Sequence, residues 1–386
     1  MIVAGGGVMG AAAAFWLTRL SPGISVAVIE RDPGHARSST ALSVASIRSQ
    51  FSHPVNVQIS RFGIGFIRDF ARHCPQGGVA DLGLRENGYL FLTGRTDQAA
   101  LMRDLAAMQR GFGAGTEVLD AAALRARFPW LSLDDVVAGS FGPRDEGWFD
   151  NMGLLAGLRA QARAQGARFI ADEVTGVVAQ GGRIQALRLA SGQSLAGGAF
   201  VNAMGTRAAH LLRWLGHDLP VEPRKRTVFV IDAPNARHPD APLLVDHTGF
   251  YLRPESGHWI CATVPQEDGP CDPEDFTPDH RLFEDQIWPA LHARAPGFDQ
   301  VKVVRMWVGH YAYNRLDQNA ILGRHPDVGN LFLANGFSGH GLQQAPAVGR
   351  GLAEQILTGR WQALDLSALG VERILSGSPC LERAVV

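Results

Sequence analysis

Residues 5–10 of this chain read Gly5-Gly6-Gly7-Val8-Met9-Gly10. They follow a short apolar run, Met1-Ile2-Val3-Ala4, and lead into four consecutive alanines at 11–14. Glycines at G-x-G-x-x-G spacing between a strand and a helix are typical of a dinucleotide-binding turn. The first permits the tight turn, the second lets the backbone approach a pyrophosphate, and the third lets the helix pack on the sheet. The stretch therefore predicts a nucleotide site at the N-terminus of the first helix.

An acidic residue lies where such a unit requires one. Residues 25–29, Ser25-Val26-Ala27-Val28-Ile29, predict a second strand, and Glu30 follows it directly. A carboxylate at this place accepts hydrogen bonds from the ribose hydroxyls of an adenosine, and it disfavours a 2′-phosphate by charge repulsion. These residues alone leave FAD and NAD as alternatives.

Composition limits the remaining possibilities. A chain of 386 residues predicts two domains. Its 36 Lys and Arg against 37 Asp and Glu form no basic stripe, so we expect no nucleic-acid partner. Cys74, Cys261, Cys271 and Cys380 lack metal-ligand or disulfide spacing, so we expect no metal. No run is apolar for long enough to span a bilayer, and we expect a cytoplasmic protein, with peripheral attachment to the inner membrane as an alternative.

The middle of the chain is rich in strands. Residues 228–231, 249–252 and 259–262 are apolar runs separated by turn residues, which predicts an antiparallel sheet. A buried strand at 199–201 and a further one at 331–334 return to the pattern of the opening unit. The nucleotide-binding domain is therefore predicted to be interleaved with a second, substrate-binding domain.

A second glycine-rich loop follows the late strand, Gly336-Phe337-Ser338-Gly339-His340-Gly341. The helix that leaves it carries Val348, Leu352 and Ile356 at helical spacing. Such a loop can direct backbone N–H groups and a helix N-terminus at a ligand that is becoming negative. A flavin that accepts a hydride becomes negative along its N1 to C2 carbonyl edge, so the loop favours a flavin. A plain turn is the alternative interpretation.

Together these motifs resemble a known family. The opening unit with Glu30, the segment Val201-Asn202-Ala203-Met204-Gly205 and the late loop are similar to the D-amino-acid oxidase, glycine oxidase and sarcosine oxidase superfamily of FAD enzymes. The resemblance covers nearly the whole chain. Further motifs resemble a subgroup that includes a mitochondrial protein assisting the assembly of respiratory complex I. These motifs are Phe128-Pro129-Trp130, Asp145-Glu146-Gly147-Trp148-Phe149-Asp150, Tyr311-Ala312-Tyr313-Asn314, Asp317-Gln318-Asn319 and Gly341-Leu342-Gln343-Gln344-Ala345-Pro346.

The resemblance implies a mixed α/β (α+β) fold. A discontinuous Rossmann-like FAD-binding domain would comprise residues 1–80, 150–218 and 317–386. Residues 81–149 and 219–316 would form a substrate domain on a mostly antiparallel sheet. The residues that the resemblance places against FAD are Gly5, Gly7, Gly10, Glu30, Arg31, Ser38, Ser39, Thr40, Val174, Gly205, Gly336, Phe337, Gly339, His340, Gly341, Leu342 and Gln343.

Two departures from better-known members affect the expected chemistry. Where some members attach the flavin through a cysteine or a histidine, this chain has His310 and Leu42, so non-covalent FAD is expected. Sarcosine oxidases place an oxygen-activating lysine in the strand that here reads Trp259-Ile260-Cys261-Ala262. Without it, a dehydrogenase is favoured over an oxidase.

Four residues are candidates for the substrate site. Arginine binds a carboxylate through two parallel N–H groups, which makes Arg48 and Arg253 candidates for holding an amino acid. Arg48 also matches a carboxylate-binding position of the sarcosine oxidase pattern. A salt bridge or a capped carbonyl is the alternative for each arginine. Tyr251 and His310 would shape the pocket.

The resulting hypothesis is an FAD-dependent oxidoreductase that oxidises the C–N bond of an amino acid or N-alkyl amino acid by hydride transfer to flavin N5. Its electrons would pass to a quinone or protein acceptor. One alternative is an FAD-binding protein that assists assembly of a respiratory complex with little turnover. Another is a nicotinamide-dependent dehydrogenase, which the late loop disfavours.

Overall fold

The computed structural model describes residues 1–383, and its first sheet has six strands in the order β18-β19-β12-β1-β2-β8. Neighbouring strands are parallel except β18, which pairs antiparallel with β19. The central strands are apolar except for their last residues, Glu30, Asn202 and Asn335, as expected of parallel strands covered on both faces. The strands are β1 (Ile2–Ala4), β2 (Ala27–Glu30), β8 (Arg168–Ala171), β12 (Phe200–Asn202), β18 (Ile321–Arg324) and β19 (Leu331–Asn335).

Alternate residues of these strands face two different layers. Val3, Val28 and Val201 pack with helices α1 (Val8–Leu20), α2 (Pro54–Arg68), α6 (Asn151–Ala164) and α9 (Gly341–Thr358). Ile2 and Ala4 pack on the other side with helix α7 (Ala208–Arg213) and a small antiparallel sheet. That sheet contains β9 (Val174–Gln180), β10 (Arg183–Leu189) and β11 (Ser194–Ala196).

Helix boundaries follow local signals. The carboxylate of Asp150 accepts a hydrogen bond from the Gly153 amide at 2.8 Å and so caps the N-terminus of α6. Helix α2 begins at Pro54, a proline in its first turn. It ends at Arg68, and a short helix, α3 (Phe70–His73), follows Asp69, whose ψ of 22° leaves the helical range. The break lets Phe70 bury its ring beside Phe66.

The second sheet has eight strands in the order β17-β13-β16-β15-β14-β4-β6-β5. Only its β14–β4 pair is parallel among the pairs described, so the predicted mostly antiparallel sheet is confirmed. The precise residue boundaries of the two predicted domains remain a prediction. The strands are β4 (Tyr89–Thr93), β5 (Glu117–Asp120), β6 (Ala138–Gly142), β13 (Val221–Asp232), β14 (Leu243–Val245), β15 (Phe250–Glu255), β16 (His258–Thr263) and β17 (Lys302–Asn314).

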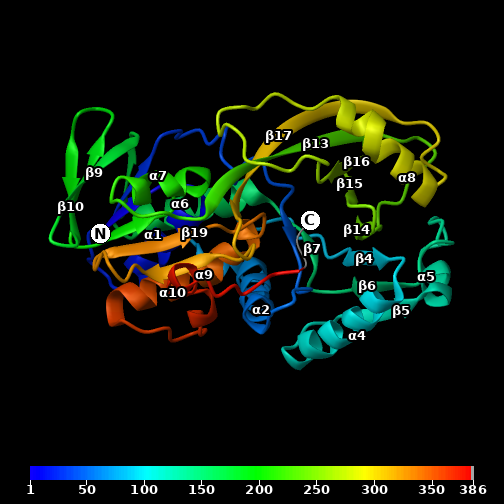
Figure 1. Ribbon diagram of the computed structural model, residues 1–386, viewed down its shortest axis with the longest axis horizontal. Coiled ribbons are helices and arrows are strands. Elements are labelled where there is room, and N and C mark those ends of the chain that lie inside the picture. The colour runs from blue at the N-terminus through cyan, green and yellow to red at the C-terminus, as the bar shows by residue number, and fades with distance from the viewer. Residues whose placement is uncertain (384–386) are drawn as a thin grey trace.

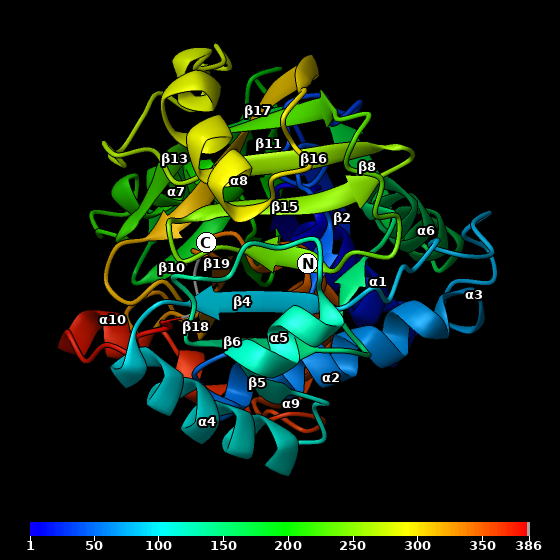
Figure 2. The same cartoon turned by 90° about the vertical axis from the view of Figure 1, so that its right-hand side faces the viewer.

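The two faces of this sheet also differ. One face packs on α5 (Ala121–Arg127) and α8 (Trp288–Arg294), which lie in front of the strands in Figure 2. The other face turns toward the first sheet. Residues on the helix-covered face are Leu90, Phe229, Leu244 and Leu252, and the residues that precede or follow them on the opposite face are Tyr89, Val228, Leu243 and Tyr251.

The part of the molecule built on the first sheet is called the first lobe, and the part built on the second sheet is called the second lobe. Two long strands join these lobes. β13 and β17 pair antiparallel along nearly their whole length, and Figure 1 shows them crossing from the second sheet toward the first. A two-stranded ribbon of β3 (Ser46–Ile47) and β7 (Gly147–Trp148) also connects them. Helix α4 (Thr96–Gly111) covers the outer side of the second lobe. Within residues 1–383 no helix is both long and apolar enough to cross a membrane.

The packing of α1 on α9 generates a stability prediction. A Cβ added at Gly349 of α9 would lie 2.7 Å from the Ala12 Cβ and 2.9 Å from the Ala12 carbonyl oxygen of α1. Gly349→Ala should therefore lower the free energy of unfolding by about 1–3 kcal/mol through overpacking. Gly65→Ala is the matched control, because Gly65 of α2 is exposed and has open space around its added Cβ.

Thermal unfolding of the two variants measures the difference. Gly65→Ala should leave stability unchanged or raise it by up to about 1 kcal/mol through helix propensity. Equal melting temperatures for Gly349→Ala and the wild type would show that the two helices do not depend on this close contact.

Candidate functional site

A long pocket lies between the two sheets, at the carboxyl ends of β1, β2 and β12. Its void is about 2000 Å³, including the open mouth. Ligands of open α/β sheets bind at this edge, outside the carboxyl ends of the strands. The first sheet contributes Gly5, Glu30 and Ala203 to the lining, and the second contributes Val228 and Tyr251. The pocket is therefore built by both lobes.

Two helices begin at this pocket. Val8 is the first residue of α1 and Gly341 the first of α9, and both line the void. Neither helix has an acidic residue in its first turn. Free N–H groups and the helix dipole make each N-terminus partly positive. The arrangement can bind an anion at the N-terminus of one helix and stabilise a developing negative charge at the N-terminus of the other.

Glycines permit the close approach of backbone around the pocket. Gly5 has φ of +98°, and a Cβ there would lie 2.3 Å from the Ala203 carbonyl oxygen. Gly339 has φ of +93°, and its added Cβ would lie 2.8 Å from the Tyr311 ring. Any side chain at these positions would move the loops that carry the lining residues.

The acid after β2 is held in place by backbone groups. Glu30 accepts hydrogen bonds from the Gly6 amide at 2.7 Å and from the Asp32 amide at 2.8 Å. It lies at the edge of the pocket and is partly exposed. These two hydrogen bonds hold the Glu30 carboxylate at the wall of the pocket.

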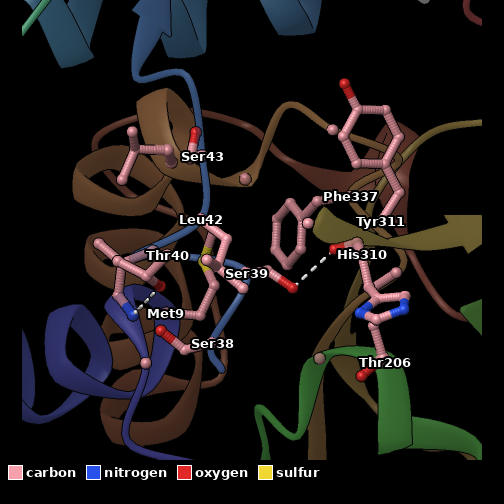
Figure 3. Close-up of a pocket in the computed structure, with 18 of the residues that line it drawn as sticks. Met9, Ser38, Ser39, Thr40, Leu42, Ser43, Thr206, His310, Tyr311 and Phe337 are labelled. Atoms are coloured by element: carbon pink, nitrogen blue, oxygen red, sulfur yellow. Dashed lines mark hydrogen bonds between the residues drawn. The ribbon is translucent and has the colours of Figure 1, made fainter. Parts of the chain in front are cut away.

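The hydroxyl-rich loop after Glu30 also reaches the pocket (Figure 3). Thr40 Oγ1 accepts a hydrogen bond from the Val8 amide at 3.1 Å, so it satisfies one of the N–H groups at the start of α1. Ser39 Oγ donates to the His310 carbonyl oxygen at 2.8 Å, across the boundary between the lobes. Ser38 Oγ donates to the His35 carbonyl oxygen at 3.0 Å. These hydroxyls hold the loop in addition to lining the pocket.

The structure brings most predicted site residues together. All the residues predicted for the cofactor line the pocket except Gly10 and Gly336. Gly10 lies beneath it, where an added Cβ would be 1.9 Å from the Gly5 carbonyl oxygen. Gly336 has φ of +67° and packs against Asn314 and Val221. These two glycines allow the surrounding backbone to pack, and they do not face the void.

Of the four substrate candidates, Arg48, Tyr251 and His310 line the pocket and Arg253 does not. The Arg253 guanidinium pairs with Glu255 and donates to the Val44 carbonyl oxygen at 3.0 Å. It also lies 4.9 Å from the centre of the Trp148 ring. The ion-pair and carbonyl-capping alternative therefore describes Arg253.

Arg48 lies in an aromatic cage. Its side chain is buried, and the guanidinium carbon is 4.1 Å from the centre of the Phe51 ring and within 5.6 Å of Tyr89 and Phe91. Nη2 lies 3.0 Å from His340 Nε2, directly before α9. The rings hold the guanidinium plane by cation–π contact, in surroundings with little water.

A buried acid braces the turn that follows Arg48. Glu146 accepts hydrogen bonds from the Ser49 amide at 2.8 Å and from Gln50 Nε2 at 2.7 Å. Gln50 in turn supplies the carbonyl oxygen that accepts from Arg48 Nη1. Burial raises the pKa of the Glu146 carboxyl to about 7, and the two hydrogen bonds oppose this rise. Glu146 therefore fixes the backbone around Arg48.

Burial also shifts the pKa values of other titratable side chains in the pocket. It raises the pKa of Tyr89, Tyr251 and Tyr311 and lowers the pKa of His310. These side chains are therefore neutral near pH 7. The His310 Nε2 atom is buried without a hydrogen-bond partner among residues 1–383. The Phe276 ring packs edge-to-face against this imidazole, with ring centres 4.6 Å apart.

Comparison with known proteins identifies the family. The profile of DAO, described as FAD dependent oxidoreductase, matches residues 1–355. The chain belongs to this family. It is 36% identical to FAD-dependent oxidoreductase domain-containing protein 1 of Xenopus laevis, over 100% of this chain and 84% of that protein. It is 26% identical to a glycine oxidase of Geobacillus kaustophilus, over 96% of each chain.

Solved DAO-fold structures are similar over almost the whole chain. The L-proline dehydrogenase of P. horikoshii superimposes with a TM-score of 0.87 and 25% identity, covering 98% of both chains. The glycine oxidase of Geobacillus kaustophilus gives a TM-score of 0.80 with 23% identity, covering 96% of this chain and 97% of that one. The mixed fold that the sequence predicts is thereby confirmed.

The residues of the pocket fit FAD, the cofactor of the DAO family. The glycine turn and the N-terminus of α1 would hold the pyrophosphate, with Glu30 on the ribose. The N-terminus of α9 and the loop before it would surround the pyrimidine end of the ring. This fit is supported by two helix N-termini that line one void, neither with an acidic residue in its first turn.

Sequence reasoning missed several lining residues. Some are direct neighbours of predicted ones, such as Glu173 before Val174 and Met204 beside Gly205, so a wider window would have included them. Others lie on the second sheet, where only strand alternation could have indicated their direction. Lining residues outside the predicted set include Arg37, Leu42, Ser43, Val44, Tyr89, Arg207, Arg226, Val228, Leu243, Pro273 and Tyr311.

One cluster outside the pocket has metal-ligating side chains. His217, His325 and Asp327 place one potential ligand atom each within 4.8 Å of the others. His325 Nδ1 already accepts a hydrogen bond from the Asp327 amide at 3.2 Å. That bond leaves the proton of the neutral ring on Nε2, so neither ring nitrogen is prepared to bind a metal. We assign no metal to it.

Proposed function

We propose that this protein holds FAD non-covalently and oxidises the C–N bond of an amino acid or N-alkyl amino acid, as a dehydrogenase rather than an oxidase. The observation that carries the proposal is the position of Arg48. The buried Arg48 guanidinium lies in the same pocket as the N-terminus of α9. Its Nη2 atom is 3.0 Å from Nε2 of His340, the residue that precedes that helix. A carboxylate-binding group and a flavin-stabilising group would thus act on one substrate.

FAD bound in the pocket would supply a hydride acceptor at N5. Arg48 would bind the substrate carboxylate through two N–H groups and fix the α-carbon near the ring. The amine would bind neutral, so the transfer needs no general base. The pocket supports this scheme, because its tyrosines and His310 are neutral near pH 7.

The wall opposite the first sheet favours an apolar group beside the carboxylate. Val228, Leu243 and Tyr251 face the void from three different strands of the second sheet. Tyr89 continues this wall toward Arg48. An aliphatic side chain, a ring or an N-methyl group would displace water from this surface.

The relatives support an amino-acid substrate. One is a glycine oxidase that aligns with 96% of this chain, and a similar structure is an L-proline dehydrogenase. Both names specify an amino acid. Neither name identifies which amino acid this protein accepts.

Two features favour a non-covalent dehydrogenase. Leu42 and His310 line the pocket where some family members attach FAD, and leucine cannot form that bond. Lys225 and Lys302 are the lysines of the chain, and neither lines the pocket. The pocket therefore offers no lysine ammonium to activate oxygen. Electrons would pass instead to a quinone or a protein acceptor.

The test is anaerobic reduction of the purified, FAD-loaded protein by a panel of amino acids and N-methyl amino acids. We expect one class to bleach the flavin absorbance, and the bleaching to persist after air is admitted. Rapid return of colour would show an oxidase. Bound FAD that no amine bleaches would favour the alternative of an FAD-binding assembly protein. FAD in the supernatant after acid precipitation would verify non-covalent binding.

Arg48 variants test the substrate position. Arg48→Lys keeps the charge and removes one of the two parallel donors, so substrate affinity should fall by about 1.5–3 kcal/mol, the contribution of a hydrogen bond to a charged group. FAD should remain bound. Arg253→Lys is the matched control, because Arg253 is equally buried and lies outside the pocket. Anaerobic titration gives both affinities, and unchanged affinity in Arg48→Lys would remove Arg48 from the site.

A further inference from the structure

The segment 264–281, between β16 and the π-helical turn η2 (Phe283–Ile287), reaches the edge of the pocket. It runs back along β13 toward the first lobe (Figure 1). The Asp279 amide donates to Thr227 Oγ1 at 3.1 Å, and the Cys271 amide donates to the Pro223 carbonyl oxygen at 3.0 Å. Pro273 then lines the pocket. We call this segment the β16–η2 loop.

Glu274, next to Pro273, contacts three arginines of the first lobe. Its carboxylate accepts from Arg31 at 2.7 Å, lies 3.4 Å from Arg37 and pairs closely with Arg207. The arginines come from separate segments, since Arg31 follows β2, Arg37 lies in the next loop and Arg207 ends the 3₁₀ turn η1 (Gly205–Arg207). All three line the pocket.

One carboxylate thus gathers three cations that would otherwise repel each other. Hydrogen bonding from Arg31 and Arg207 lowers the pKa of Glu274 to about 2, so it is ionised throughout the neutral range. Glu173 also lies 3.9 Å from Arg31, so two carboxylates share the three arginines. The arginines lie next to Glu30, at the end of the pocket where the glycine turn would hold a pyrophosphate.

The loop has other attachments to β13 that do not involve Glu274. Asp268 pairs with Arg226 at 2.6 Å and with Arg224 at 3.1 Å. Asp275 pairs with Lys225 at 2.7 Å. A substitution at Glu274 therefore removes the contact with the three arginines and leaves the attachment of the loop to the second lobe.

From these contacts we infer that Glu274 is a positioning residue for the cofactor, holding Arg31, Arg37 and Arg207 across the Glu30 end of the pocket. Joined to the β16–η2 loop in this way, the arginines close over the nucleotide half of FAD and slow its release. The inference rests on the proposed FAD site, and it is independent of the substrate. In this inference the ion pairs retain the cofactor in addition to joining the two lobes.

The test measures FAD release from the holoprotein after dilution, by recovery of free flavin fluorescence. Glu274→Gln should release FAD roughly three- to tenfold faster at low ionic strength, the size expected of several partly exposed ion pairs acting together. The excess over wild type should shrink at high ionic strength, because salt screens the same pairs. Glu274→Asp keeps the charge on a shorter side chain, so its rate of FAD release should lie between those of the wild type and Glu274→Gln.

Glu267→Gln is the matched control. Glu267 lies in the same loop, is exposed and has no cationic partner among residues 1–383. Its variant should release FAD at the wild-type rate. An equal effect of both substitutions would overturn the inference, since general charge loss would then explain the result.

Two other outcomes would also overturn it. Unchanged release from Glu274→Gln would show that the ion pairs only join the lobes. Slower release would show that Glu274 competes with FAD phosphate for the arginines. If Glu274→Gln does not fold, two measurements replace it: FAD release from the wild type at rising ionic strength, and FAD release from Glu274→Asp. Release from the wild type that does not change with salt would overturn the inference. A failure to find an amine substrate does not affect any of these measurements.

Discussion

The close packing of α1 against α9 is the constraint on which the site depends. Gly10 allows α1 to pass over the turn at Gly5, and Gly349 allows α9 to pass over Ala12. Larger side chains at these positions would separate the helices from each other or from the sheet. Because the helices pack closely, their N-termini reach the same pocket, and one void receives two partly positive helix ends without an acidic residue in either first turn.

The second lobe completes this pocket through strand alternation. Each strand that packs an apolar residue on the helix-covered face must direct its neighbour toward the first lobe. Tyr251 and Val228 reach the pocket for this reason, while Leu252 and Phe229 form the core beneath α8. The orientation of the Arg48 side chain has a different cause. The aromatic rings around it and the turn held by Glu146 fix its position. The Arg48 end of the pocket is thus more aromatic and better buried than the Glu30 end.

Sequence reasoning succeeded where the signal was local. The glycine turn and the late loop each depend on residues within a few positions of one another. It failed where the position along a strand, or a contact between distant residues, decides the outcome. Arg253 lies on the same face as Tyr251 but two residues farther along β15, about 7 Å away, where it meets Glu255 instead of the pocket. The brace at Glu146 and the contacts of Glu274 join residues distant in sequence, and no local pattern reports them.

The central claim is that one pocket holds FAD with its pyrophosphate at α1 and a substrate carboxylate at Arg48. A crystal structure of the holoprotein with a small carboxylate that lacks an amine tests it most directly. We predict the pyrophosphate within hydrogen-bond distance of backbone N–H groups at the start of α1, and the carboxylate paired with both terminal nitrogens of Arg48. FAD in another position, or a carboxylate bound away from Arg48, would contradict the account.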